Sequence, residues 1–134
     1  MGRKLAREKA MQALFQIEVA KIDVDKAIGN VLEESEMDDA GKAYVFKLVK
    51  GTYENIDKID ALIRAKALKW ELERIGNVEK AVLRLAVYEV IFEEEVPAAV
   101  AINEAINMVK MFSTKNGVPF VNAILDKIAK ENSG

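Results

Sequence analysis

Few side chains in this sequence are suited to catalysis. Histidine and cysteine are both absent from the 134 residues. Their absence excludes Ser-His-Asp and Cys-His catalysis, thiolate metal sites and disulfide bonds. Acids are plentiful, but the consecutive Glu93, Glu94 and Glu95 would point in different directions at a helix end, as a solvated edge. We therefore predict no enzyme, no catalytic residue, no metal site and no cofactor.

Basic residues gather at the two ends of a chain whose net charge is −2. The first 21 residues hold five basic and two acidic residues, and residues 110–130 hold four lysines and one aspartate. Arg3, Lys4 and Arg7 fall in the first two turns of a predicted helix, where cations oppose the helix dipole. A solvated helix start is the simpler explanation, and contact with RNA or DNA phosphates is the functional one.

A second candidate site is the connector between two predicted helices, "STKNGVP", which Phe112 and Phe120 bracket. Asn116 can cap the helix that follows, with Pro119 in its first turn. Core packing would explain both rings. The functional alternative adds Lys115 and free backbone amides that bind phosphate, and an aromatic face that stacks on an unpaired base.

These residues must be positioned by helices. The chain is 51% hydrophobic and 31% charged, has two prolines, and shows apolar residues at helical spacing with no strand-like alternation. We predict an all-α fold of about seven helices in two packed helical subdomains. The expected helices cover residues 3–20, 23–32, 39–63, 69–76, 78–92 and 97–112, and a last helix carries the apolar stripe of residues 120–128. Asp23 or Asp25 would cap the second helix, and Asp38 or Asp39 the third.

The chain is expected to form one domain over residues 1–134. Within it, a bundle of residues 1–68 packs on a bundle of residues 69–134, and the long third helix bridges the two. Residues 78–92 are apolar almost all round, which predicts a buried central helix. No run of 18 apolar residues and no signal-peptide core occurs, so we expect a cytoplasmic protein without a membrane span.

Four residues in or beside the predicted helices have simple structural explanations. Gly51 would allow a close approach of two helices, and Asn77 would cap the central helix. Arg84 would form an ion pair with an acid of a neighbouring helix. Glu79 would complement the dipole at the start of the central helix and could be exposed toward a partner.

Four stretches together resemble the NusB family. They are "AREKAMQALFQIE" at residues 6–18, "GTYENIDKIDALI" at 51–63, "VEKAVLRLAVYEV" at 78–90, and the pattern "VPAAVAINEAI", "F" and "FVNAILDKI" within 96–128. The resemblance covers nearly the full length in the same order. It implies an all-helical, non-enzymatic transcription antitermination factor. Such a factor binds the single-stranded boxA element of ribosomal RNA transcripts with the ribosomal protein NusE, and acts with RNA polymerase and other Nus factors.

The resemblance also implies site residues. The family's basic arm falls on Arg3, Lys4 and Arg7, and its second RNA-contacting region falls on Phe112, Lys115, Asn116 and Phe120. The NusE-facing surface would include Phe15 and Glu79. We expect the arm and the turn to form the two halves of an RNA clamp.

This chain departs from the family pattern in both RNA regions. The arm lacks a run of arginines, and Asn116, Pro119 and Ala123 stand where an acid, a lysine and a glycine are usual, which predicts weak RNA affinity without NusE. Two other functions stay open. One is an RNA-binding accessory domain for a ribosomal RNA-modifying enzyme on a separate chain. The other is a protein-binding helical module or homodimer.

Overall fold

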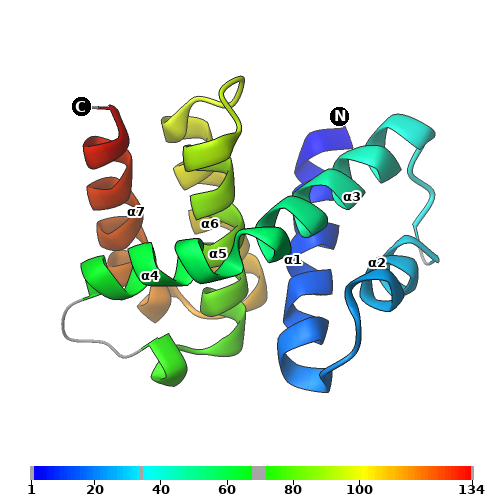
Figure 1. Ribbon diagram of the computed structural model, residues 1–134, viewed down its shortest axis with the longest axis horizontal. Helices are drawn as coiled ribbons and strands as arrows, with labels where there is room; N and C mark the ends of the chain where they lie inside the picture. Colours follow the sequence, from blue (N-terminus) through cyan, green and yellow to red (C-terminus); the bar gives the residue numbers. More distant parts are fainter. Residues whose placement is uncertain (1, 34, 68–71, 134) are drawn as a thin grey trace.

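The computed structural model describes residues 2–33, 35–67 and 72–133 (Figure 1). Over these ranges the fold is all-α, as predicted, with seven α-helices and two 3₁₀ turns. The helices are α1 (Gly2–Ala20), α2 (Val24–Glu33), α3 (Asp39–Glu54), α4 (Ile56–Ala67), α5 (Asn77–Phe92), α6 (Ala98–Phe112) and α7 (Val118–Ser133). The turns are η1 (Leu72–Arg74) and η2 (Lys115–Gly117).

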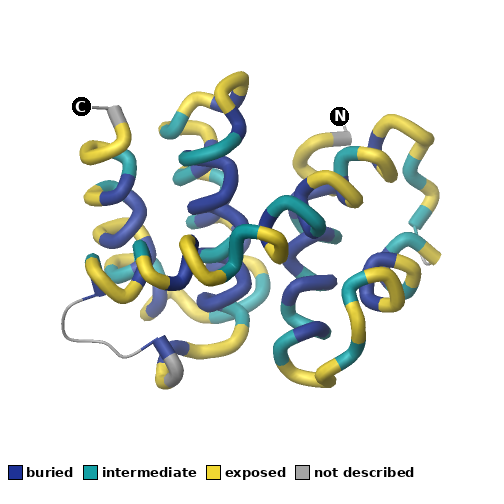
Figure 2. Tube along the Cα trace, in the orientation of Figure 1, coloured by how far each residue is buried: buried dark blue, intermediate teal, exposed yellow. Residues whose placement is uncertain are grey.

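Helix α5 is the buried centre of the molecule (Figure 2), which confirms the prediction made for this segment. It contacts α1 and α3 in one bundle and α4, α6 and α7 in the other. Leu83 and Leu85 are fully buried, and each contributes about 2 kcal/mol through removal of apolar surface from water. The predicted boundary between the two bundles, after residue 68, lies outside the described residues.

Aspartate side chains begin α2 and α3. Asp23 accepts a hydrogen bond from the backbone N–H of Lys26, and Asp38 accepts one from Gly41, each at 2.8 Å. Each bond satisfies an amide that the first helical turn leaves without a partner, which stabilises a helix by about 1 kcal/mol. In both helices the first of the two predicted capping residues is the one that acts.

The prediction of one long helix over residues 39–63 is wrong, because the chain breaks at Asn55 between α3 and α4. The Asn55 side chain donates to the carbonyl of Gly51 at 2.8 Å, and its backbone N–H donates to the carbonyl of Thr52 at 3.2 Å. Asparagine competes in this way with regular helical hydrogen bonds. The pair still spans both bundles, since α3 packs on α1 and α2 while α4 packs on α5 and α7.

Two other predicted helix starts also differ from the structure. Asn77 is the first residue of α5, and Gly76 occupies the N-cap position without a side-chain hydrogen bond. Pro97 is the N-cap of α6 and stands one residue before its first turn. Of the short helix predicted over residues 69–76, the structure describes the η1 turn, while residues 68–71 lie outside the described part.

Gly51 lets α3 approach α5 closely, as predicted. A Cβ atom at this position would overlap the ring of Tyr88. The Tyr88 hydroxyl donates to Glu93 Oε2 at 3.0 Å, and burial followed by this hydrogen bond raises the pKa of Tyr88 to about 12. Glu93 is buried and also pairs with Lys47 at 3.0 Å, so the expectation of a solvated acidic edge is wrong for this residue.

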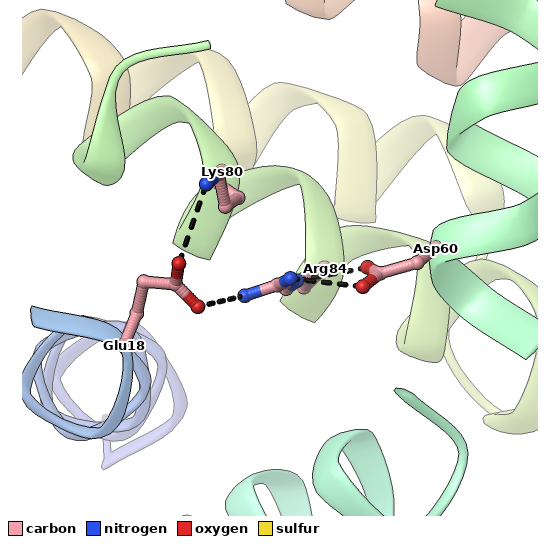
Figure 3. A network of polar contacts seen from close by, with 4 residues as sticks. All are labelled: Glu18, Asp60, Lys80 and Arg84. Atoms are coloured by element: carbon pink, nitrogen blue, oxygen red, sulfur yellow. Dashed lines mark hydrogen bonds and ion pairs between the residues drawn. The ribbon is translucent and has the colours of Figure 1, made fainter. Parts of the chain in front are cut away.

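Arg84 joins three helices through ion pairs, which confirms its predicted structural role (Figure 3). Its Nε and Nη2 atoms donate to the two carboxylate oxygens of Asp60 on α4, each at 2.8 Å. Its Nη1 donates to Glu18 on α1 at 3.0 Å, and Lys80 Nζ lies 3.3 Å from the other oxygen of Glu18. The network therefore fixes the end of α1 and the middle of α4 against α5.

Candidate nucleic-acid interface

The amino-terminal arm presents two exposed cations, Arg3 and Lys4, on the first turn of α1. The Arg3 guanidinium carbon lies 4.7 Å from the centre of the Tyr44 ring on α3, a cation–π contact. Lys4 stands next to α6, where it lines a small pocket with Asn107 and Met111. Both cations can reach an anionic ligand.

Arg7 is buried and does not belong to this exposed arm. The prediction that it binds RNA phosphates together with Arg3 and Lys4 is therefore corrected. Only 4% of the residue is exposed. Its Nε donates to both carboxylate oxygens of Glu89 on α5, at 2.9 and 3.0 Å, and its Nη1 lies 3.8 Å from Glu104 on α6. Arg7 is therefore the cation of a buried ion pair that joins α1 to the other bundle.

Tyr44 connects the exposed arm to this buried pair. Its hydroxyl donates to Glu89 Oε2 at 3.2 Å, while its ring lies under Arg3. Burial, followed by the charge of Glu89, raises the pKa of Tyr44, so the hydroxyl keeps its proton and remains a donor. The conformation of Arg3 is thus linked to a buried carboxylate.

The predicted RNA-contacting turn lies between α6 and α7. Lys115 and Asn116 are exposed, and Phe112 and Phe120 are half-buried. Asn116 lies inside η2, and Gly117 is the residue before α7, so the prediction that Asn116 caps α7 is wrong. Pro119 does lie in the first turn of α7, as predicted. The turn therefore exposes one cation and one amide between two partly accessible rings.

Phe112 and Phe15 line one cavity of about 340 Å³. Met11, Gln12, Gln16, Val31 and Val78 complete the lining. Phe112 is one of the residues predicted to contact RNA, and Phe15 is one of those predicted to contact NusE. The structure therefore brings together two residues that the sequence assigns to different partners.

The arm and the turn lie near opposite ends of α1 (Figure 1). Twelve residues separate Arg3 from Phe15, and a helical rise of 1.5 Å per residue gives a separation of about 18 Å along the axis. Lys4 lines a small pocket with Met111 of α6, and Phe15 shares its cavity with Phe112 at the end of α6. A ligand that touches both predicted halves can therefore run beside α1 and α6.

Glu79 is buried, with 8% of the residue exposed, so the prediction that it is exposed is wrong. Its carboxylate accepts a hydrogen bond from the Ser113 hydroxyl and lies against Gly76 and Gly117. Glu79 can affect a partner-facing surface only through the residues that it holds.

Sequence reasoning missed Tyr44, Glu89 and Ser113. A signal existed for Glu89, because a carboxylate on an otherwise buried helix needs a cationic partner. Nothing in the sequence near Tyr44 or Ser113 indicates their contacts, which join residues 45 and 34 positions apart.

In the described ranges, no cluster of three or more acidic side chains is arranged to hold a metal ion. None of the helices described has both the length and the apolar character that crossing a membrane requires.

The fold and surface define an all-helical protein of two bundles that share a central helix and carry exposed cations beside accessible aromatic rings. The NusB family profile matches residues 4–130. The transcription antitermination protein NusB of Bacillus subtilis is 42% identical over 131 residues, which cover 98% of this chain and 97% of that protein. The chain belongs to the NusB family.

The solved structures that are similar over nearly the whole chain include the following two. NusB of T. maritima superposes with a TM-score of 0.92 at 39% identity, covering 98% of this chain and 93% of that one. A chain of the complex of the antitermination factors NusB and NusE with double-stranded RNA gives a TM-score of 0.90 at 27% identity, covering 97% of each chain. The predicted family and fold are confirmed.

Proposed function

We propose that this protein is a transcription antitermination factor that binds the boxA element of nascent ribosomal RNA together with NusE. It acts without catalysis, in the cytoplasm, by holding the transcript to the elongating RNA polymerase with other Nus factors. The observation that carries the proposal is the likeness over nearly the whole chain to antitermination proteins, one of which was solved with NusE and RNA.

The proposed RNA path follows α1 and α6. Arg3 and Lys4 contact phosphates at one end, and Lys115 and Asn116 do so at the other. Phe112 and Phe120 offer partly accessible rings on which unpaired bases stack, and such stacking contributes about 1–3 kcal/mol per base. The charge of Arg7 is already paired with Glu89, so Arg7 does not contact the RNA in this proposal. It supports the path by holding α1 against α5.

NusE is proposed to meet the surface that contains Phe15 and the start of α5. Phe15 is half-buried at the edge of the cavity that it shares with Phe112, so a bound protein there would lie beside the RNA. Glu79 shapes this surface from beneath. A contact shared by NusE and RNA accounts for the expected weak RNA affinity of the isolated protein.

A titration of labelled boxA RNA, with and without NusE and at two salt concentrations, tests the proposal. Binding should be tighter with NusE, weaker at high salt, and stronger for the single strand than for the same sequence in a duplex. Salt-independent or absent RNA binding in the presence of NusE would instead favour a protein-binding module or homodimer. If RNA binds without preference for boxA, the alternative of an accessory domain for an RNA-modifying enzyme gains support.

Replacing Arg3 and Lys4 together with alanine should weaken boxA binding across sequences. Because each lost phosphate contact on a single strand lowers the salt slope of log K by about 0.7, two contacts lower it by about 1.4. The melting temperature should change little, since both side chains are exposed. The matched control is the exposed pair Lys26 and Lys42 on α2 and α3, replaced in the same way. If the two double variants have the same salt slope of log K, Arg3 and Lys4 do not contact the RNA phosphates.

A further inference from the structure

Glu79 fills the space between two glycines on different elements. It is the third residue of α5, and one carboxylate oxygen lies against Gly76, the N-cap of that helix. The other oxygen lies against Gly117 at the end of η2, where an added Cβ would be 2.7 Å from Oε2. No larger residue fits at Gly117 without displacing this carboxylate. The side chain therefore packs directly beneath the turn.

Ser113 ties the other end of the same turn to the same carboxylate. It is the C-cap of α6, with its backbone N–H donating to the carbonyl of Val109 at 2.8 Å, and its hydroxyl donates to Glu79 Oε2. A buried carboxylate requires such donors, and its position in the first turn of α5 is favourable to the helix dipole. Glu79 thus accepts a hydrogen bond from residue 113 and packs against residue 117.

Lys115 and Asn116 lie between Ser113, which is bonded to Glu79, and Gly117, which packs against it, and both are exposed. We propose that Glu79 and Ser113 are positioning residues that hold Lys115 and Asn116 in the conformation that binds RNA. This inference rests on the proposed RNA contact of the turn. A turn that is already ordered loses less conformational entropy on binding, so the tether raises affinity without touching the ligand.

Replacing Ser113 with alanine tests the tether, because it removes the hydroxyl donor and leaves the backbone and the exposed cation in place. In the presence of NusE, boxA affinity should fall about fivefold to tenfold, which lies within the lower half of the range expected for coupled neighbouring residues. Ser113→Thr, which keeps the hydroxyl, should retain most of the affinity. Thr114→Ala is the matched control, since Thr114 is exposed and its side chain makes no capping hydrogen bond, and it should bind like the parent.

A double-mutant cycle separates positioning from a general loss of stability. The effects of Ser113→Ala and Lys115→Ala on affinity should be less than additive. When Lys115 is no longer held in position it already contributes little to RNA binding, so removing it weakens binding little further. Ser113→Ala and Arg3→Ala should be additive, since Arg3 lies at the other end of α1. In the free protein, the backbone amide resonance of Asn116 should shift more in Ser113→Ala than in Thr114→Ala, although residue 114 is nearer to it in the sequence.

The outcomes distinguish the tether from the RNA contact itself. If Lys115→Ala alone leaves boxA affinity unchanged, the turn is outside the RNA site and both proposals fail there. If Lys115→Ala weakens binding while Ser113→Ala does not, or if the two effects add in full, the RNA contact stands and the tether is overturned. Should Ser113→Ala fail to fold, Glu79→Met takes its place in the same cycle with the same criteria, since it keeps most of the side-chain volume and removes the acceptor of the Ser113 hydroxyl. Because Glu79 also lies beneath the proposed NusE surface, this titration is made at NusE concentrations that saturate the variant.

Discussion

Replacing Arg7 with methionine should lower the free energy of unfolding by about 3–5 kcal/mol, because the change leaves a buried carboxylate without its cation. The Glu89 side chain is 1% exposed, and both of its carboxylate oxygens accept hydrogen bonds from the Arg7 Nε atom. Methionine fills much of the same volume, so the loss reports the charge rather than a cavity. Chemical denaturation at neutral pH measures the change.

Arg3→Met is the matched control, four residues earlier on the same helix. Arg3 is exposed, and its contact with Tyr44 contributes about 0.5–1 kcal/mol at such a site. The two variants should therefore have opposite effects: Arg7→Met lowers stability and leaves the salt slope of RNA binding unchanged, while Arg3→Met lowers the slope and nearly preserves stability. If Arg7→Met has a lower salt slope of RNA binding under conditions in which the protein is fully folded, Arg7 does contact the RNA.

Adding Glu89→Leu to Arg7→Met should recover part of the lost stability, because the unpaired charge is then removed from the interior. The recovery is incomplete, since the Tyr44 hydroxyl loses its acceptor and Glu104 loses a nearby cation. If the double variant were less stable than Arg7→Met, the unpaired carboxylate would not be the source of the loss.

Most of the helices are predictable from sequence because they have one clear apolar stripe each. The apolar stripe also explains why the prediction of one helix over residues 39–63 fails at Asn55. Val45, Val49 and Thr52 before the break, and Ile59 and Ile63 after it, are all buried. The apolar spacing therefore continues across the junction between α3 and α4. The break is marked by the side-chain hydrogen bond from Asn55 to Gly51 and the backbone hydrogen bond from Asn55 to Thr52, and apolar spacing does not report either of them.

Arg7 could have been distinguished from its basic neighbours by helical register. Ala10, Met11 and Leu14 stand three, four and seven residues after it and are buried, so Arg7 lies on the stripe that faces the core. Its partner Glu89 is 82 positions away, and no local pattern identifies a contact of that range. The sequence therefore predicts that this arginine needs an acid but not which acid supplies the charge.

The burial of Glu79 depends on tertiary structure as well as on helical register. Val82, Leu83 and Ala86, three, four and seven residues after it, are buried, but a glutamate in the first helical turn is normally solvated. It is covered because η2, whose sequence position is more than 30 residues later, returns to the start of α5 and places Gly117 against it. The sequence singles out Lys115 and Asn116 because their neighbours are turn residues, and both are exposed in η2. The hydrogen bond between Ser113 and Glu79 beneath them is not visible in the sequence.

Replacing Arg84 with methionine should lower the free energy of unfolding by about 3 kcal/mol at pH 7, the lower end of the range for a broken buried pair. The lower end is appropriate because Arg84 and Asp60 retain 14% and 12% side-chain exposure, and Glu18 retains 29%. Without Arg84, the carboxylates of Asp60 and Glu18 lose the guanidinium that connects them across α4, α5 and α1 (Figure 3).

The pH dependence identifies the charge as the cause. The hydrogen bond from Arg84 holds the pKa of Glu18 below its ordinary value of 4.5. Stability from this pair is therefore present above pH 4.5 and is lost as the pH falls through the lower, folded-state pKa. The stability difference between the parent and Arg84→Met should narrow between pH 5 and pH 3 (about the range of carboxylate titration), whereas the exposed control Lys127→Met should follow the parent throughout. A difference that stays constant to pH 3 would assign the loss to the packing of the arginine stem instead of its charge.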